Sequence, residues 1–387
     1  MTRLLKTLVA LAVLYSPLAL GVSSASARPP QPVHVPDALE ETWSVETKGA
    51  INIAPLMVGD LVIVVPTGKP MHAFNAKTGK VAWTYTAAGG VWNRGFSSDG
   101  ERVYVCIKGG RIAALNVKDG REVWRRDLGI NCQRPQHIDG DTLFVPTTYI
   151  GPGLAGIPLP SAKLFALNRF NGSTEWVFKS KNYLLQTPAT YGDTIYVGGA
   201  YMDPTFQGGE SGSTRMYALD RKTQKIKWSF TALDGVPKKL HATKDHLIYA
   251  GYDDFVFKVD AKTGKKVWTH NTGNWIPSLV VEGNRIYYGS ATTIVFSIDI
   301  NDGNPVWEYH IPGPAFNYLL IKPVLTKDRV YFLSQRGYTV ALDKATGKEI
   351  WLYETGMGPR VGLSVSSDGY IYIGASNGDL RAYKIMK

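Results

Sequence analysis

Cysteine is scarce in this chain of 387 residues, in which Cys106 and Cys132 are the only two. Two cysteines cannot form a disulfide framework, and the haem-attachment pattern Cys-x-x-Cys-His is absent. The apolar run over residues 8–20 is broken by Pro17 and is too short for a bilayer-spanning helix. These absences exclude a disulfide framework and a c-type haem attachment site.

Acidic residues are outnumbered, with 32 Asp and Glu against 43 Lys and Arg, so the formal net charge is +11. The basic residues are scattered along the chain and form no basic run with interleaved aromatic residues. Nucleic acid is therefore a minor candidate partner, although the positive charge leaves it open.

The first 27 residues have the features of a secretory signal peptide. Arg3 and Lys6 precede the apolar run, and residues 25–27 (Ala-Ser-Ala) form a small-x-small cleavage site. No twin-arginine pair is present, and no cysteine follows the run to accept a lipid. We expect an exported protein, periplasmic or in the cell envelope and not lipidated, in which the loss of Arg3 and Lys6 lowers the net charge to +9. Retention as an uncleaved membrane anchor stays open. Residues 28–41, which begin with a proline-rich stretch, are expected to be an extended lead-in.

One eleven-residue frame recurs seven times, first in residues 73–83. A strand ends on Asn or Asp, a tight turn follows (through Thr78-Gly79 in the first copy), and a tryptophan stands eight residues after the Asn or Asp. Asn and Asp can bond the backbone two residues on and Gly tolerates positive φ, so both favour a tight turn. The other copies are residues 114–124, 166–176, 218–228, 258–268, 297–307 and 341–351. The recurrence predicts a repeated β-unit, in which Gln224 replaces the turn glycine of the fourth copy.

Each unit contains four strand signals, which in the first unit are residues 51–58, 60–65, 70–75 and 80–86. Units of this length fit four-stranded propeller blades. Residues 42–45 look like the last strand of a unit, and residues 369–383 look like a unit that lacks that strand. Joined, the two fragments make an eighth unit and leave no exposed sheet edge at the ends of the array. The sequence therefore predicts an all-β fold over residues 42–387, an eight-bladed β-propeller of four-stranded antiparallel blades closed by the N-terminal strand.

Two units are longer than the others, because residues 146–162 and 198–214 are inserted between their second and third strands. In an up-and-down blade this connection lies on the same face as the link to the next blade, and the Thr-Gly turns lie on the opposite face. Long loops on a rigid scaffold often carry function. We therefore expect a partner or ligand to bind on the insertion-bearing face.

The frame Ala-x-Asp/Asn-x-x-Thr-Gly-x-x-x-Trp resembles the tryptophan-docking repeat of the pyrroloquinoline-quinone (PQQ) propeller superfamily, over residues 42–385. The resemblance implies that the frame tryptophans pack between adjacent blades and stabilise the fold. These residues are Trp43, Trp83, Trp124, Trp176, Trp228, Trp268, Trp307 and Trp351. In the superfamily, quinoprotein dehydrogenases oxidise alcohols or sugars with PQQ and Ca²⁺, whereas members resembling BamB, the outer-membrane assembly factor, are non-catalytic protein-binding scaffolds.

The chain is short and lacks the adjacent Cys-Cys pair of the alcohol-oxidising branch, so its size and plain layout look more like BamB. It differs from BamB in having no cysteine that could be lipidated after the apolar run. We interpret it as a monomeric, exported, non-catalytic scaffold without a cofactor, which mediates protein–protein interactions in the cell envelope. The alternative is a small quinoprotein dehydrogenase that binds PQQ with Ca²⁺ at the propeller axis.

Polar, basic and aromatic residues recur in the links that follow each tryptophan. Because these links lead to the innermost strands, we expect their side chains to surround the axis on the insertion-bearing face. The set is Asn52, Trp92, Asn93, Arg94, Gln133, Arg134, Lys238, Lys239, Trp275, Phe316, Asn317, Tyr318 and Arg360. Cations and two indoles around one funnel suit an anionic planar ligand such as PQQ, or an acidic peptide segment of an envelope protein. Simple solvation of these loop residues is the third possibility.

Cys106 is expected to end a second strand and Cys132 to lie in the link after the same blade, so both lie near one face. A disulfide between them is geometrically possible and an exported compartment permits it, while two separate thiols are the alternative. No histidine pair or carboxylate group has a metal-ligand spacing. No Ser/His/Asp or Cys/His set can be assembled either, so we expect neither catalytic residues nor a metal site.

Overall fold

The computed structural model describes residues 38–149, 161–181, 184–200, 214–232, 238–251, 254–312, 322–356 and 362–386. The predicted signal peptide, residues 28–37 of the lead-in and most of both insertions lie outside these residues. The described part of the chain consists of strands and their connections, and no helix long and apolar enough to cross a membrane occurs in it.

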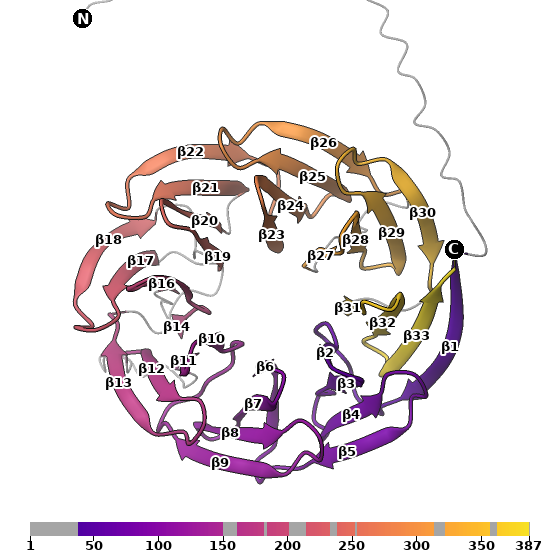
Figure 1. The fold of residues 1–387 in the computed structure, drawn as a ribbon, viewed down its shortest axis with the longest axis horizontal. Helices are drawn as coiled ribbons and strands as arrows, with labels where there is room; N and C mark the ends of the chain where they lie inside the picture. The colour runs from indigo at the N-terminus through magenta and orange to yellow at the C-terminus, as the bar shows by residue number, and fades with distance from the viewer. Residues whose placement is uncertain are drawn as a thin grey trace, which may run out of the picture. The chain divides into compact units, whose positions relative to one another are not determined.

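In the described residues, 33 strands form eight antiparallel sheets, the blades, which follow one another around a central axis (Figure 1). Blades 1–4 contain β2 (Leu56–Val58), β3 (Leu61–Val64), β4 (Met71–Asn75) and β5 (Val81–Tyr85); β6 (Val91–Ser98), β7 (Arg102–Ile107), β8 (Arg111–Asn116) and β9 (Glu122–Asp127); β10 (His137–Asp139), β11 (Thr142–Pro146), β12 (Lys163–Asn168) and β13 (Thr174–Lys179); and β14 (Leu184–Leu185), β15 (Ala189–Tyr191), β16 (Thr194–Ala200), β17 (Thr214–Asp220) and β18 (Ile226–Ala232). Blade 4 has five strands because its innermost strand is divided into β14 and β15, which both pair with β16.

Blades 5–8 contain β19 (Lys238–Ala242), β20 (His246–Ala250), β21 (Phe255–Asp260) and β22 (Lys266–Asn271); β23 (Ser278–Glu282), β24 (Arg285–Gly289), β25 (Ile294–Asp299) and β26 (Pro305–His310); β27 (Val324–Leu325), β28 (Arg329–Leu333), β29 (Tyr338–Asp343) and β30 (Glu349–Glu354); and β31 (Gly362–Val365), β32 (Tyr370–Gly374), β33 (Asp379–Ile385) and β1 (Leu39–Glu46). The predicted eight-bladed all-β propeller is confirmed.

The N-terminal strand closes the ring. β1 is the outermost strand of blade 8 and pairs antiparallel with β33, with Leu39 opposite Ile385 and Glu46 opposite Asp379 (Figure 1). The strand begins at Leu39, ahead of the residue 42 expected from the sequence, because the Leu39 side chain is only 5% exposed and packs in the core between blades 7 and 8. Closure by the N-terminal strand is confirmed.

The Asn/Asp turn forms in all seven frames, where the N–H at the glycine position donates to the carbonyl of the Asn or Asp (2.8–2.9 Å). In blade 5 the Asp260 carboxylate also accepts hydrogen bonds from the hydroxyl and the N–H of Thr263, both at 2.7 Å, and these bonds lower the pKa of Asp260. Gly264 then adopts φ +71°. Gln224, which replaces this glycine in blade 4, adopts the same left-handed conformation with φ +57°, so the turn is retained.

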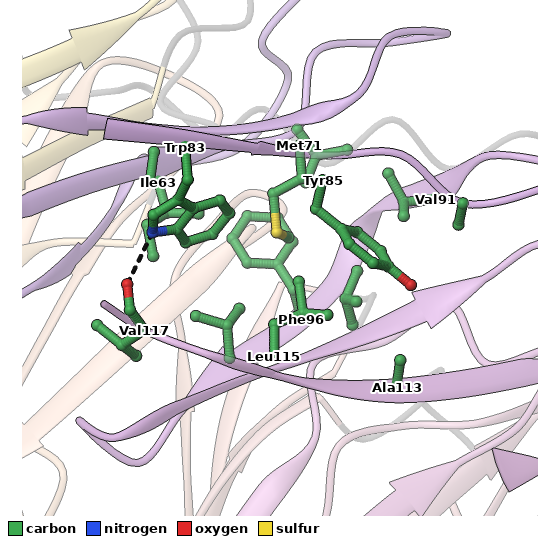
Figure 2. Packing of buried hydrophobic residues seen from close by; sticks show 14 of the residues in the cluster. Ile63, Met71, Trp83, Tyr85, Val91, Phe96, Ala113, Leu115 and Val117 are labelled. Atoms are coloured by element: carbon green, nitrogen blue, oxygen red, sulfur yellow. Dashed lines mark hydrogen bonds between the residues drawn. The ribbon is translucent and has the colours of Figure 1, made fainter. Parts of the chain in front are cut away.

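The frame tryptophans join neighbouring blades. In the described residues, six of the eight indoles donate a hydrogen bond of 2.7–3.2 Å to the carbonyl that follows the Asn or Asp in the turn of the next blade. Trp83 of blade 1 donates to Val117 of blade 2 at 2.7 Å and lies among Met71, Tyr85 and Phe96 (Figure 2). The turn glycine is required there, because a Cβ on Gly120 would lie 2.6 Å from the Trp83 ring.

Trp351, at the ring closure, lacks this bond. It is 4% exposed, and within the described residues its Nε1 has no hydrogen-bond partner. Blade 8 has no turn between its third and outermost strands, because these are β33 and β1 from the two ends of the propeller. At the equivalent position, Ile385, the chain pairs with Leu39 of β1 instead of forming a docking turn.

An ion pair adds a second contact between blades 2 and 3. Asp99 Oδ2 accepts hydrogen bonds from Tyr104 Oη (2.7 Å) and from Arg169 Nη1 (2.5 Å), which lies in the docking turn of blade 3. Burial alone would raise the pKa of Asp99, but hydrogen bonds from Tyr104, the backbone and Arg169 outweigh it and lower the pKa. Arg221 of blade 4 pairs in the same way with Asp139 of blade 3.

Candidate functional site

Backbone hydrogen bonds define two faces of the propeller. The links between blades bond to the connections between second and third strands, as in Lys108 N–H to Gly90 O (2.9 Å) and Thr148 N–H to Asn131 O (2.8 Å). We call this side the link face. The Trp-docking turns bond instead to the turns between first and second strands, as in Ala76 N–H to Asp60 O (2.8 Å), and form the opposite turn face. The described start of the first insertion, at Thr148, is therefore on the link face.

The structure describes the predicted link residues in part. Asn52, Trp92, Asn93, Arg94, Gln133, Arg134 and Trp275 have described side chains, and for Lys238 and Lys239 only the backbone, at the start of β19, is described. Phe316, Asn317, Tyr318 and Arg360 lie outside the described residues. The predicted link residues with described side chains lie in two separate regions of the ring. Trp92 is in β6 and Trp275 precedes β23, and these two strands lie on opposite sides of the axis (Figure 1).

The hydroxyl of Thr67 brings two predicted residues together. Asn52 Nδ2 and Asn93 Nδ2 each donate to Thr67 Oγ1 at 3.0 Å, and Thr67 Oγ1 donates to Ala50 O at 3.1 Å. Asn52 precedes blade 1, Thr67 follows its second strand, and Asn93 begins blade 2. Three segments far apart in the sequence are thus tied at one point of the link face.

Trp92 lies beside this point, half-buried against the core between blades 2 and 3. The ammonium of Lys108 lies 5.5 Å from the centroid of its ring, within the range of a cation–π contact. Arg94, two residues further on in β6, is exposed. An indole, an ammonium and a guanidinium are therefore close together along the sequence and on one face.

Gln136 and a disulfide hold the next link. The buried Gln136 amide donates to Gly95 O and Arg134 O, both at 3.2 Å, and its oxygen accepts a bond from Ser97 Oγ at 2.9 Å. The structure joins Cys106 and Cys132 in a disulfide with a Cα–Cα distance of 5.6 Å. A Cβ at Gly95 would lie 2.8 Å from the Cys106 Cβ, so β6 must approach this bridge closely. Residues 133–134 are consequently fixed next to residues 92–94.

A cavity of about 460 Å³ lies among the inner strands on the other side of the axis. Aliphatic residues of blades 6, 7 and 8 line most of it, and Lys322, Glu282 and Ser364 contribute polar atoms. The Lys322 side chain is accessible from the cavity, yet the atoms packed around it still lower its pKa by desolvation. Glu282 forms an ion pair with Lys344 of the next blade.

Thr67, Gln136, Lys108 and Lys322 were not predicted from the sequence. Thr67 and Gln136 act through hydrogen bonds between segments far apart in the chain, and Lys322 is distinguished by the cavity around it. The spacing of the two cysteines was the only sequence signal for the tie between blades 2 and 3.

The described residues contain no group of three His, Cys, Asp or Glu side chains that could hold a metal ion. The polar groups that the structure brings together on the link face are amides, cations and an indole. Such groups bind anions and hydrogen-bond acceptors, but they supply no activated nucleophile and no acid–base pair.

Comparison with known proteins agrees with the fold. The sequence profile of one family, described as outer membrane protein assembly factor BamB, matches residues 37–129, 108–232 and 162–387. BamB of Burkholderia pseudomallei is 23% identical over 81% of this chain and 82% of that protein. Tetrathionate hydrolase of Acidithiobacillus ferrooxidans is 22% identical over 67% of this chain, which spans 66% of that enzyme. Quinohemoprotein alcohol dehydrogenase of Comamonas testosteroni is 21% identical over 80% of this chain but only 41% of that enzyme.

Solved structures show the same fold in both functional classes. BamB from Moraxella catarrhalis superposes with a TM-score of 0.63, at 20% identity, over 89% of this chain and 97% of that one. The Comamonas quinohemoprotein alcohol dehydrogenase superposes with a TM-score of 0.68, at 15% identity, over 90% and 77% of the two chains. The propeller is therefore shared by BamB and an alcohol dehydrogenase, and the family follows from the sequence profile, which matches the chain from residue 37 to its end. The chain belongs to the BamB family of PQQ-type β-propellers.

Proposed function

We propose that this protein is an exported, non-catalytic scaffold that binds another protein of the cell envelope on its link face. The observation that carries the proposal is the fixed arrangement of blades 1–3, where Thr67, Gln136 and the disulfide tie the loops that display Trp92 and Arg94. A rigid surface with exposed cations and an indole is suited to binding a partner, because little conformational freedom is lost on association.

Two further facts support the proposal. The described link-face loops of blades 1–3 contain no Asp or Glu, and the chain covers most of the length of the BamB proteins that it resembles. The predicted signal peptide is the basis for placing the protein outside the cytoplasm, in the periplasm or cell envelope. The absence of a cysteine after the apolar run is the basis for proposing a non-lipidated form.

The second candidate function, a small quinoprotein dehydrogenase, is favoured by the similarity to the Comamonas enzyme and by the cavity beside the axis. The residues that line this cavity do not fit PQQ with Ca²⁺. They offer Lys322 as the single cation and Glu282 as the single carboxylate, and Glu282 is already paired with Lys344. Ca²⁺ requires six to eight oxygen ligands, which this described lining does not supply.

One experiment separates the two functions. Purified mature protein is titrated with PQQ and Ca²⁺, followed by absorbance and by dye reduction with alcohols and sugars, while a photo-crosslinker at position 88, an exposed residue of the link between blades 1 and 2, is used to capture partners in envelope extracts. Capture of a defined envelope protein, with no stoichiometric PQQ binding, is the expected result. Stoichiometric PQQ binding with substrate-dependent dye reduction would refute the scaffold proposal.

A further inference from the structure

The link face has an uneven distribution of charge. Around blades 1–3 its described loops are residues 47–55, 65–70, 86–95, 107–111, 128–136, 146–149, 161–163, 179–181 and 184–188, which contain nine Lys or Arg and no Asp or Glu. Around blades 4–8 the described residues of the corresponding loops contain five Lys or Arg and three carboxylates, namely Arg215, Lys238, Lys239, Lys322, Arg336, Asp254, Glu354 and Asp379. One side of the described face is therefore strongly cationic, and the remainder has charges of both signs.

Most of these cations are available to a partner. Six have exposed side chains, namely Lys48, Lys69, Arg94, Lys108, Lys179 and Lys181. Within the described residues, none of the six forms an ion pair with a carboxylate. We call this set the cationic half-face.

A second group of contacts holds the half-face in shape. Arg111 Nη2 donates to Ala88 O (3.0 Å) and Lys108 O (3.3 Å), which fixes the loop that presents Lys108 over the Trp92 ring. The disulfide fixes the adjacent link. Unneutralised charge on loops that do not rearrange attracts an anionic partner at long range and orients it on contact.

We propose that the cationic half-face binds an acidic, extended peptide segment of a partner protein, with Trp92 contacting an apolar or aromatic side chain of that segment. The proposal rests on the proposed scaffold function and specifies the chemistry of its partner. Carboxylates of the segment would form charge-assisted hydrogen bonds with Lys69 in the β3–β4 connection of blade 1, Arg94 at the start of blade 2 and Lys181 in the link between blades 3 and 4. An extended strand of about twelve residues spans about 40 Å, which suits a surface made by several blades.

The uneven charge decides against a planar anionic partner. A lipid bilayer resting on the link face would also approach the other half, where Asp254, Glu354 and Asp379 lie among the described residues. These carboxylates offset the cations of that half, so it would attract the headgroups only weakly, whereas a peptide can follow the loops of blades 1–3 alone. The half-face has only one indole on which a base could stack, and single-stranded nucleic acid requires a series of them.

The test uses a fluorescent peptide of about twelve residues, rich in Asp and Glu with one central Tyr, and measures anisotropy with the mature protein in low salt and in about 0.3 M salt. The variant Lys69→Glu/Arg94→Glu/Lys181→Glu reverses three charges of the half-face. The matched control Lys77→Glu/Lys118→Glu/Lys225→Glu makes the same change of net charge at exposed positions in the docking turns of the turn face. Thermal melting verifies that both variants fold.

We expect the half-face variant to weaken peptide binding by at least about tenfold and the control by less than about twofold, with salt weakening binding to the wild type. Equal losses in the two variants would overturn the proposal, since net charge alone would then account for binding. Tighter binding of the wild type to anionic vesicles or to an oligonucleotide than to the peptide would overturn it as well.

Envelope capture by crosslinking separates this inference from the scaffold function. If the charge-reversed variant captures the same envelope protein as the wild type, the acidic-segment proposal fails and the scaffold function stands. If the wild type captures no protein at all, the scaffold function itself fails.

Discussion

The contact between each docking tryptophan and the next turn can be tested by adding a single methyl group. Gly120 and Gly140 both have left-handed backbones, with φ +69° and +59°. A Cβ on Gly120 would lie 2.6 Å from Cε3 of Trp83, whereas a Cβ on Gly140 has no heavy atom within 4 Å. Gly120→Ala and Gly140→Ala therefore share a backbone cost and differ in the steric conflict with the indole.

The left-handed conformation costs an alanine about 1 kcal/mol relative to glycine. An alanine at position 120 also forces the Trp83 indole to move. This movement is costly because the Trp83 side chain is only 6% exposed and donates a 2.7 Å hydrogen bond to Val117 O. Overpacking of this kind adds about 1–3 kcal/mol. We expect Gly140→Ala to lower the free energy of unfolding by about 1 kcal/mol and Gly120→Ala to lower it by about 2–4 kcal/mol.

The measurement is equilibrium unfolding in urea, followed by circular dichroism and by tryptophan fluorescence, with reversibility established for the wild type. The comparison is valid if the two variants have the same dependence of the free energy on urea concentration. If Gly120→Ala is no more destabilising than Gly140→Ala, the close contact between turn and indole does not contribute to stability and the reasoning is wrong.

Three further predictions concern other contacts of the ring. Trp83→Phe should lower the free energy of unfolding by about 1 kcal/mol more than Trp351→Phe, because only the first indole has a hydrogen bond to lose; equal losses in urea titrations would contradict this. The lowered pKa of Asp99 stabilises the folded protein fully above the unfolded value of about 3.9, and this contribution disappears as the pH falls through the folded pKa. The advantage of the wild type over Asp99→Asn in thermal melting should therefore shrink between about pH 5 and pH 3, and a constant difference would rule out this linkage. Replacement of Cys106 and Cys132 by Ala opens a covalent loop with a sequence separation of 26 residues and should destabilise the protein by about 3 kcal/mol, whereas unchanged unfolding, or free thiols titrated in the unreduced wild type, would show that the bridge is not used.

The fold could be predicted because its information is local and repeated. The turn depends on one Asn or Asp that bonds atoms two or three residues away, and the tryptophan follows at a constant distance, so each frame can be recognised without knowing the others. Strand ends were less accurate. The first strand signal of unit 1 was expected over residues 51–58, but β2 covers only Leu56–Val58, because residues 51–55 belong to the link.

The candidate site was predicted less completely. Its loops were placed on one face by topology, but the contacts that tie them depend on side chains from different blades. Nothing in the neighbourhood of Thr67 or Gln136 in the sequence indicates that each would bond to a distant segment. The uneven charge of the link face is present in the sequence, but it can be recognised only after the loops have been assigned to faces.

The closure of the ring by β1 and β33 has a consequence for how the molecule folds. Blades 1–7 are each made from one continuous segment, whereas blade 8 needs residues from both ends of the chain. During synthesis β1 emerges before the other strands of the propeller and remains unpaired until β33 is made. The Met386 N–H to Ala38 O bond (3.0 Å) then joins the two ends. Among the described blades, β33 and β1 are the one pair of third and outermost strands that no turn connects. Unfolding should therefore begin with the release of β1 from β33.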